Sequence, residues 1–121
     1  MVVPPGSPLA RRRRITTADL ASVPLVTSPV GTSTRGLIDA AFAAIETAPD
    51  IVVETDQREA IVPLVVAGAG ASILPRPQAE AAAVFGASTV SLSPRLARSI
   101  GLVWRDGPLS PAAGAFIELR A

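Results

Sequence analysis

Short, uninterrupted apolar runs alternate along the chain with stretches whose apolar residues recur every three or four positions. Runs of the first kind are typical of strands that are buried on both faces of a sheet. Stretches of the second kind predict amphipathic helices between the strands. The predicted strands are residues 23–27, 50–55, 70–75, 88–92 and 99–105, with the end of a further strand at residues 1–3.

Residues 37–46 have the clearest helical periodicity, and Thr32 or Ser33 precedes them as a capping residue. The predicted apolar face of this helix consists of Leu37, Ile38, Ala41, Phe42 and Ile45.

The other helices have start and stop signals of their own. Asp56 and Glu59 have the spacing of a capping box, and the helix after them is expected to end at Gly68. Pro63 lies inside this helix, and nothing in the local sequence explains it. We also predict helices over residues 77–86 and 110–120, and a helical turn within residues 16–20 that Thr16 or Thr17 caps.

Strands and helices alternate throughout, and this order predicts an α/β fold whose mainly parallel sheet carries helices on both faces. We find no internal repeat and no linker between two domains. The 121 residues are enough for one domain that buries roughly two thirds of its unfolded surface. A composition that is 49% hydrophobic and 17% charged is typical of such a globular chain.

The charge and hydropathy pattern argues against binding to nucleic acids or membranes. The net charge is only +1, and the longest uncharged stretch, residues 60–75, is about one helical turn short of a membrane span. No secretory signal is visible at the N-terminus, so we expect a cytoplasmic chain. The basic run Arg11–Arg14 has no aromatic residue near it, and we interpret it as a solvated loop.

The missing residue types exclude most catalytic chemistry. The chain contains no cysteine, histidine, lysine or tyrosine, which removes thiolate and imidazole metal sites, Ser-His nucleophiles and Schiff bases. The acidic residues are scattered and show no inward-facing pair. We therefore expect no catalytic residue, metal or cofactor, and ligand binding is the better hypothesis.

Four segments stand in a characteristic order and spacing: "PPGSPLARRRRITTADLASVPLV", then the "GTSTR" of residues 31–35, then "IVVETDQREAIVPLVVAGAGASILP", then "SPRLARSIGLVWRDGPLSPAAGAFIEL". Together they resemble the effector-binding region of LysR-type transcriptional regulators, and the resemblance covers essentially the whole chain. Ser7 is a departure, because the family often has histidine there.

The resemblance implies a lobe of the type II periplasmic-binding-protein-like fold. It places in residues 1–121 the second subdomain of the effector region, followed by the strand and helix that return to the first. The family's winged helix-turn-helix domain and linker helix have no counterpart here, whether the truncation is natural or experimental. The implied function is that of an effector-sensing lobe in a homodimeric regulator that reaches DNA only through the absent domain.

The loop "SPVGTSTRG" (28–36) is the candidate site for the small-molecule effector. It follows a predicted strand, and ligands in doubly wound sheets bind outside the carboxyl ends of strands. The free N–H groups and the dipole of the next helix favour an anion, as do small hydroxyl side chains. A helix cap and a tight turn would explain the same residues without a ligand. Arg35 is a weaker candidate for ligand contact than the hydroxyl side chains. The predicted contacts are Ser28, Pro29, Val30, Gly31, Thr32, Ser33, Thr34 and, at the next junction, Thr55.

Three other functions stay open. One is an enzyme on the same fold, such as a dehydratase with a carboxylate base. Another is an extracytoplasmic solute-binding lobe. The last is a structural fragment that dimerises through an apolar patch of Leu102, Val103, Trp104, Phe116, Ile117 and Leu119.

Overall fold

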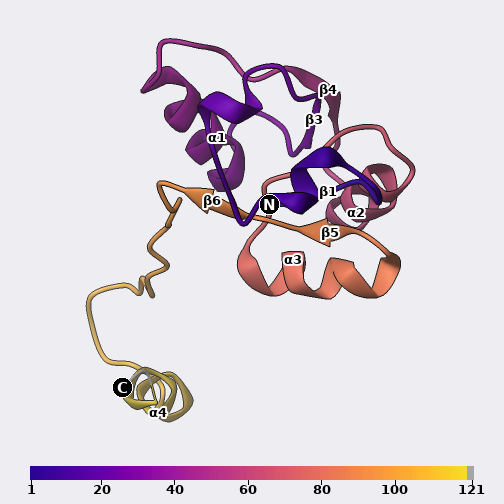
Figure 1. The fold of residues 1–121 in the computed structure, drawn as a ribbon. Coiled ribbons are helices and arrows are strands. Elements are labelled where there is room, and N and C mark those ends of the chain that lie inside the picture. Colours follow the sequence, from indigo (N-terminus) through magenta and orange to yellow (C-terminus); the bar gives the residue numbers. More distant parts are fainter. Residues whose placement is uncertain (120–121) are drawn as a thin grey trace.

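The computed structural model describes residues 1–119 as a set of short strands with helices packed around them (Figure 1). Three pairs of strands form the centre of the fold. These are β3 (Leu25–Thr27) with β4 (Ile51–Glu54), parallel; β2 (Arg14–Thr16) with β6 (Ser91–Ser93), parallel; and β1 (Val2–Val3) with β5 (Ser88–Thr89), antiparallel.

Ala71 and Ser72 join two of these pairs into one sheet. Ser72 exchanges two backbone hydrogen bonds of 2.8 Å with Val2 of β1. Ala71 donates to the Pro24 carbonyl and accepts from the Val26 N–H of β3, each at 2.8 Å. The order is therefore β4, β3, residues 71–72, β1, β5, and β1 is the one antiparallel member among these described strands. The predicted strand over 70–75 is reduced to these two residues.

Helices cover both faces of this sheet. Because successive strand residues point to opposite faces, Val3 of β1 joins a core with Phe42 of α1 (Ser33–Ala43). Val2 joins a second core with Val65 of α2 (Arg58–Val66) and Ala82 of α3 (Arg76–Ala82). The predicted α/β fold with helices on both faces is confirmed.

Three short 3-10 turns and one further helix complete the described elements. The turns are η1 (Pro8–Arg11), η2 (Ala18–Leu20) and η3 (Ala83–Phe85), and the helix is α4 (Pro111–Glu118).

Helix α1 starts earlier and ends earlier than its periodicity predicted. It begins at Ser33, directly after the capping residue Thr32, and ends at Ala43. The chain then turns back, because Glu46 has a left-handed φ of 52° and the Thr47 N–H donates to the Phe42 carbonyl at 3.1 Å. Ile45 consequently lies outside the helix and is exposed.

The predicted capping box at the start of α2 is wrong. Gln57 occupies the cap position and its side chain makes no capping bond. The Thr55 hydroxyl instead accepts the Gln57 N–H at 3.1 Å, because the chain turns at the end of β4 before the helix begins. Pro63 is exposed within α2, and nothing in the structure explains it.

Residues 99–105 do not form the predicted strand. No strand among residues 1–119 lies beside them, and an apolar run without a pairing partner has no ladder to join. Val103 is 97% exposed as a result. Helix α4 follows and lies apart from the sheet (Figure 1), with the Ser110 hydroxyl accepting the Ala113 N–H at 3.3 Å. The predicted end of this helix, Arg120, lies outside the described residues.

Candidate functional site

Several chain segments meet at one edge of the sheet. β3 leads into Ser28, β4 leads into Thr55, and Ser72 leads into residues 73–75. The antiparallel strand β1 begins at this same edge with Met1, whose N–H₃⁺ donates to the Val90 carbonyl at 3.0 Å. In an open α/β sheet ligands bind outside this carboxyl edge, so it is the place to search for a site.

Thr32 is the capping residue of α1. Its hydroxyl accepts the Arg35 N–H at 3.4 Å and donates to the Pro29 carbonyl at 2.8 Å. Gly31, with a φ of 92°, makes the turn that brings Pro29 close to Thr32. The Thr32 hydroxyl is therefore already engaged, whereas the backbone N–H groups of Ser33 and Thr34 donate to no residue in the described chain.

A small hollow of about 30 Å³ lies at this helix start. Such a volume suits one polar group and not a whole metabolite. No acidic side chain lines it among the described residues. Its lining consists of Ser28, Thr32, Ser33, Thr34, Arg58, Ile61, Leu74, Pro75, Gln78 and Arg98.

The structure brings together four of the eight predicted contact residues in this hollow, Ser28, Thr32, Ser33 and Thr34. The other four lie outside it. Pro29 and Gly31 shape the turn, Val30 is 72% exposed, and the Thr55 hydroxyl accepts the Gln57 N–H.

Arg35 forms ion pairs with two carboxylates. Its Nε donates to Asp39 Oδ1 at 2.9 Å, and its Nη1 donates to Glu54 Oε2 at 2.6 Å. The hydrogen bonds to Asp39 and then to Glu54 raise the pKa of Arg35 against the opposing effect of partial burial. This guanidinium therefore ties α1 to the end of β4, and its donors are directed at these two residues.

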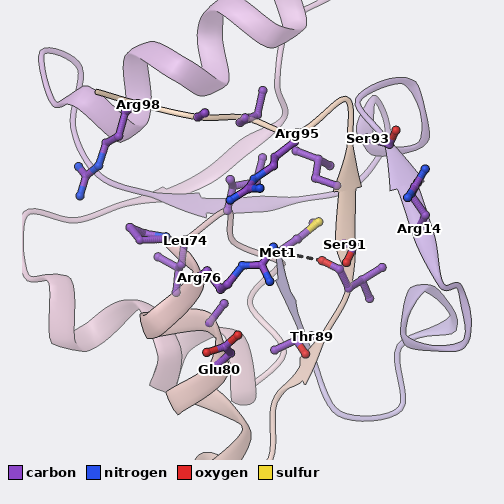
Figure 2. A pocket seen from close by; sticks show the side chains of 17 residues that line it. Met1, Arg14, Leu74, Arg76, Glu80, Thr89, Ser91, Ser93, Arg95 and Arg98 are labelled. Carbon is purple, nitrogen blue, oxygen red and sulfur yellow. Dashed lines mark hydrogen bonds between the residues drawn. The ribbon is translucent and has the colours of Figure 1, made fainter. Parts of the chain in front are cut away.

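A larger cavity of about 690 Å³ adjoins the hollow and shares Leu74, Pro75 and Arg98 with it. Its size is in the range of small-molecule sites. Arg76 and Arg95 extend into it, one from the start of α3 and the other from the segment after β6 (Figure 2). Arg14 and Arg98 lie at its margins (Figure 2).

Arg98 connects the two spaces. Its Nη1 donates to the Ser33 Oγ at 3.0 Å across 65 positions of sequence. Inside the larger cavity, burial and then the charge of Arg76 lower the pKa of the Met1 amino group. Sequence reasoning missed these arginines, because only the folded sheet brings residues 76, 95 and 98 to the edge where β3 ends.

Residues 1–119 contain no group of three or more histidine, cysteine or acidic side chains placed to hold a metal ion. None of the described helices has the length and apolar character needed to cross a membrane.

The strand order with one reversed strand, and helices on both faces, define a lobe of the type II periplasmic-binding-protein-like fold, as predicted. The model of the LysR substrate binding domain matches residues 1–120. The chain therefore belongs to the family of LysR substrate-binding domains, which is a regulatory family and not one of enzymes.

A solved structure supports the same assignment. The chain resembles the effector binding domain of QuiR in complex with shikimate, with a TM-score of 0.78 and 26% sequence identity. The similarity covers 97% of this chain and 56% of that one, so the chain spans little more than half of its length. A comparison with curated proteins finds no match.

Proposed function

We propose that this chain is the effector-sensing lobe of a LysR-type transcriptional regulator, and that it binds a small anionic metabolite at the carboxyl edge of its sheet. In this proposal residues 1–121 comprise the second subdomain of the effector region and the segment that returns to the first. Such a regulator would act in the cytoplasm as a homodimer, and it would contact DNA through a helix-turn-helix domain outside this chain.

One observation carries the proposal. The hollow at the start of α1 combines the unpaired N–H groups of Ser33 and Thr34 with the Ser33 and Thr34 hydroxyls. Arg58 and Arg98 add positive charge, and no carboxylate among the described residues lines the hollow. The helix dipole favours negative charge at the same point. These are the features that hold a carboxylate.

The remaining predicted contacts have secondary roles in this proposal. Pro29, Val30 and Gly31 give the loop its shape, and Thr55 stands at the neighbouring strand end. The similar QuiR domain holds shikimate, a small hydroxylated carboxylate, which supports a ligand of this class.

Titration of the chain with shikimate, followed by NMR, tests the proposal. The amides of Thr32–Arg35 should shift first and those of Thr55–Gln57 second. A dissociation constant of about 1 mM, or about −4 kcal/mol, is expected because only one wall of the site is present to exclude water. Saturating carboxylate that moves neither group of amides would rule the site out.

Paired variants separate binding from folding. Ser33→Ala should weaken binding and leave the free energy of unfolding nearly unchanged, because Thr32 is the cap. Thr32→Ala should cost about 1 kcal/mol of stability, and Thr32→Gly should spare most of this loss. Ser110→Ala provides a control, because it removes the same kind of cap from α4, outside the hollow.

A further inference from the structure

Positive charge is concentrated at the carboxyl edge. Five of the eleven arginines of the chain line the hollow or the larger cavity, but only one of its ten acidic residues, Glu80, does so. A chain with a net charge of +1 would carry both signs in similar numbers on an arbitrary surface. The five arginines are Arg14, Arg58, Arg76, Arg95 and Arg98.

These arginines form no ion pair within residues 1–119. The ion pairs found there involve Arg12 and Arg35 and none of the five. Glu80 lies one helical turn after Arg76 on α3, but no ion pair joins them in the described chain. Arg98 donates one hydrogen bond to the Ser33 Oγ. A guanidinium carries five N–H donors in a fork that matches a carboxylate or a phosphate, and no carboxylate within residues 1–119 pairs with any of these five.

The two spaces differ in size and share part of their lining. The small hollow has room for a single polar group, and the larger cavity, which shares Leu74, Pro75 and Arg98 with it, has the volume of a small-molecule site. Arg76 and Arg95 project into this cavity (Figure 2) and do not line the hollow.

We propose that the effector carries two ionised acidic groups. One acidic group meets the hydroxyls and N–H groups at the start of α1, and a second acidic group meets Arg76 and Arg95 in the larger cavity, with Arg98 between them. This inference rests on the proposed function, because it concerns the same ligand. A dicarboxylate and a carboxylate that bears a phosphate share this chemistry.

The second group should strengthen binding because the first already holds it close to the arginines. On an edge open to water each charge-assisted contact is modest, so we expect a dianion to bind about tenfold more tightly than the monoanion of the same length. We attribute this tenfold difference in affinity to Arg76 and Arg95. The affinity for the monoanion itself comes from the hollow at the start of α1.

Calorimetric or NMR titration of the 121-residue chain with matched pairs tests the inference. The pairs are linear dicarboxylates of four to six carbons with the monocarboxylates of equal length, and 3-phosphoglycerate with glycerate. The Arg76→Gln/Arg95→Gln variant should lose the tenfold advantage and bind monocarboxylates within twofold of the parent chain. The ligand type that is preferred, dicarboxylate or phosphorylated carboxylate, identifies the second acidic group.

The matched control is Arg11→Gln/Arg13→Gln, which removes the same charge from exposed residues outside both spaces. It should retain the advantage. Equal binding of mono- and dianions, or an advantage that both double variants reduce alike, would overturn the inference and leave the proposed function intact. If the chain binds none of the carboxylates or phosphates, the proposed function itself is contradicted, and with it the inference that rests on it.

Discussion

Asp19 is the centre of a small polar cluster that fixes the chain beside β2. Its carboxylate accepts hydrogen bonds from Arg12 Nη1 at 2.6 Å, and from the backbone N–H and the hydroxyl of Thr16 at 2.7 and 2.8 Å. Thr16 in turn accepts the Asp19 N–H at 3.2 Å. Arg11–Arg14 are all exposed, as predicted, but Arg12 has this structural partner. The prediction of a solvated loop is therefore wrong for Arg12, and the loop assignment is also wrong for Arg11, which ends η1, and for Arg14, which begins β2.

This cluster makes stability depend on pH. The hydrogen bond from Arg12, followed by those from Thr16, lowers the pKa of Asp19 from 3.8 to about 2. A carboxyl group whose folded pKa is depressed stabilises the fold above its unfolded pKa, and it loses this effect as the pH falls toward the folded value. Asp19→Asn should therefore be less stable than the parent chain at pH 5, and the difference should vanish between about pH 4 and pH 2. Urea unfolding at these pH values measures it, and a difference that stays constant across the window would contradict the assignment.

At the scale of elements, the sheet depends on a close approach between residues 70–72 and β3. A Cβ atom built on Gly70 would lie 2.5 Å from the Pro24 carbonyl oxygen, which is a backbone atom in the sheet. Only glycine allows Ala71 and Ser72 to reach both β3 and β1. The continuity of the sheet, and with it the carboxyl edge, therefore rests on this position.

Substitution of two glycines by alanine should have opposite effects. Gly70→Ala forces the backbone of Pro24 or of residue 70 to shift and should cost about 1–3 kcal/mol. Gly36→Ala lies within α1, where an added Cβ meets nothing within 4 Å, and should stabilise the chain by about 0.5–1 kcal/mol. Urea or thermal unfolding compares the two variants. If Gly70→Ala is as harmless as Gly36→Ala, the close approach does not constrain the sheet.

At the scale of the whole molecule, the segment from residue 99 to α4 carries apolar side chains that the sheet does not cover (Figure 1). Val103 is 97% exposed, and Phe116 and Leu119 of the α4 region are exposed as well. Monomeric proteins rarely leave so many large apolar side chains in contact with water, and such surfaces favour association. We therefore expect the 121-residue chain to associate with itself through this segment.

Sedimentation at micromolar concentration should reveal a dimer or a larger species. Val103→Ser/Phe116→Ser should shift the distribution toward the monomer because it removes apolar surface from this segment. Val84→Ser/Phe85→Ser provides the matched control, since these residues are also exposed but lie at η3, beside α3. A monomer at all concentrations, or an equal effect of both double variants, would contradict association through residues 99–119.

The sequence by itself determined those features that depend on neighbouring residues. Periodicity and capping residues act within one or two helical turns, so α1 with a cap at Thr32 or Ser33, and α4 with its cap Ser110, follow from local chemistry. The structure decides between the two candidates for α1 in favour of Thr32. The alternation of elements predicted the α/β class, and the four motifs in register predicted the family. The loop at residues 28–34 was found because a strand end and a helix start adjoin in the sequence.

The tertiary structure alone decided what depends on residues distant in the chain. Residues 99–105 have the composition of a strand, but a strand exists only where a neighbour accepts its hydrogen bonds, and no such neighbour is found among residues 1–119. Arg76, Arg95 and Arg98 carry no local signal of a site. Arg76 follows the segment that joins β3 to β1, and Arg95 and Arg98 follow β6, which pairs with β2. All three line one cavity, because long-range pairing sets the position of each strand.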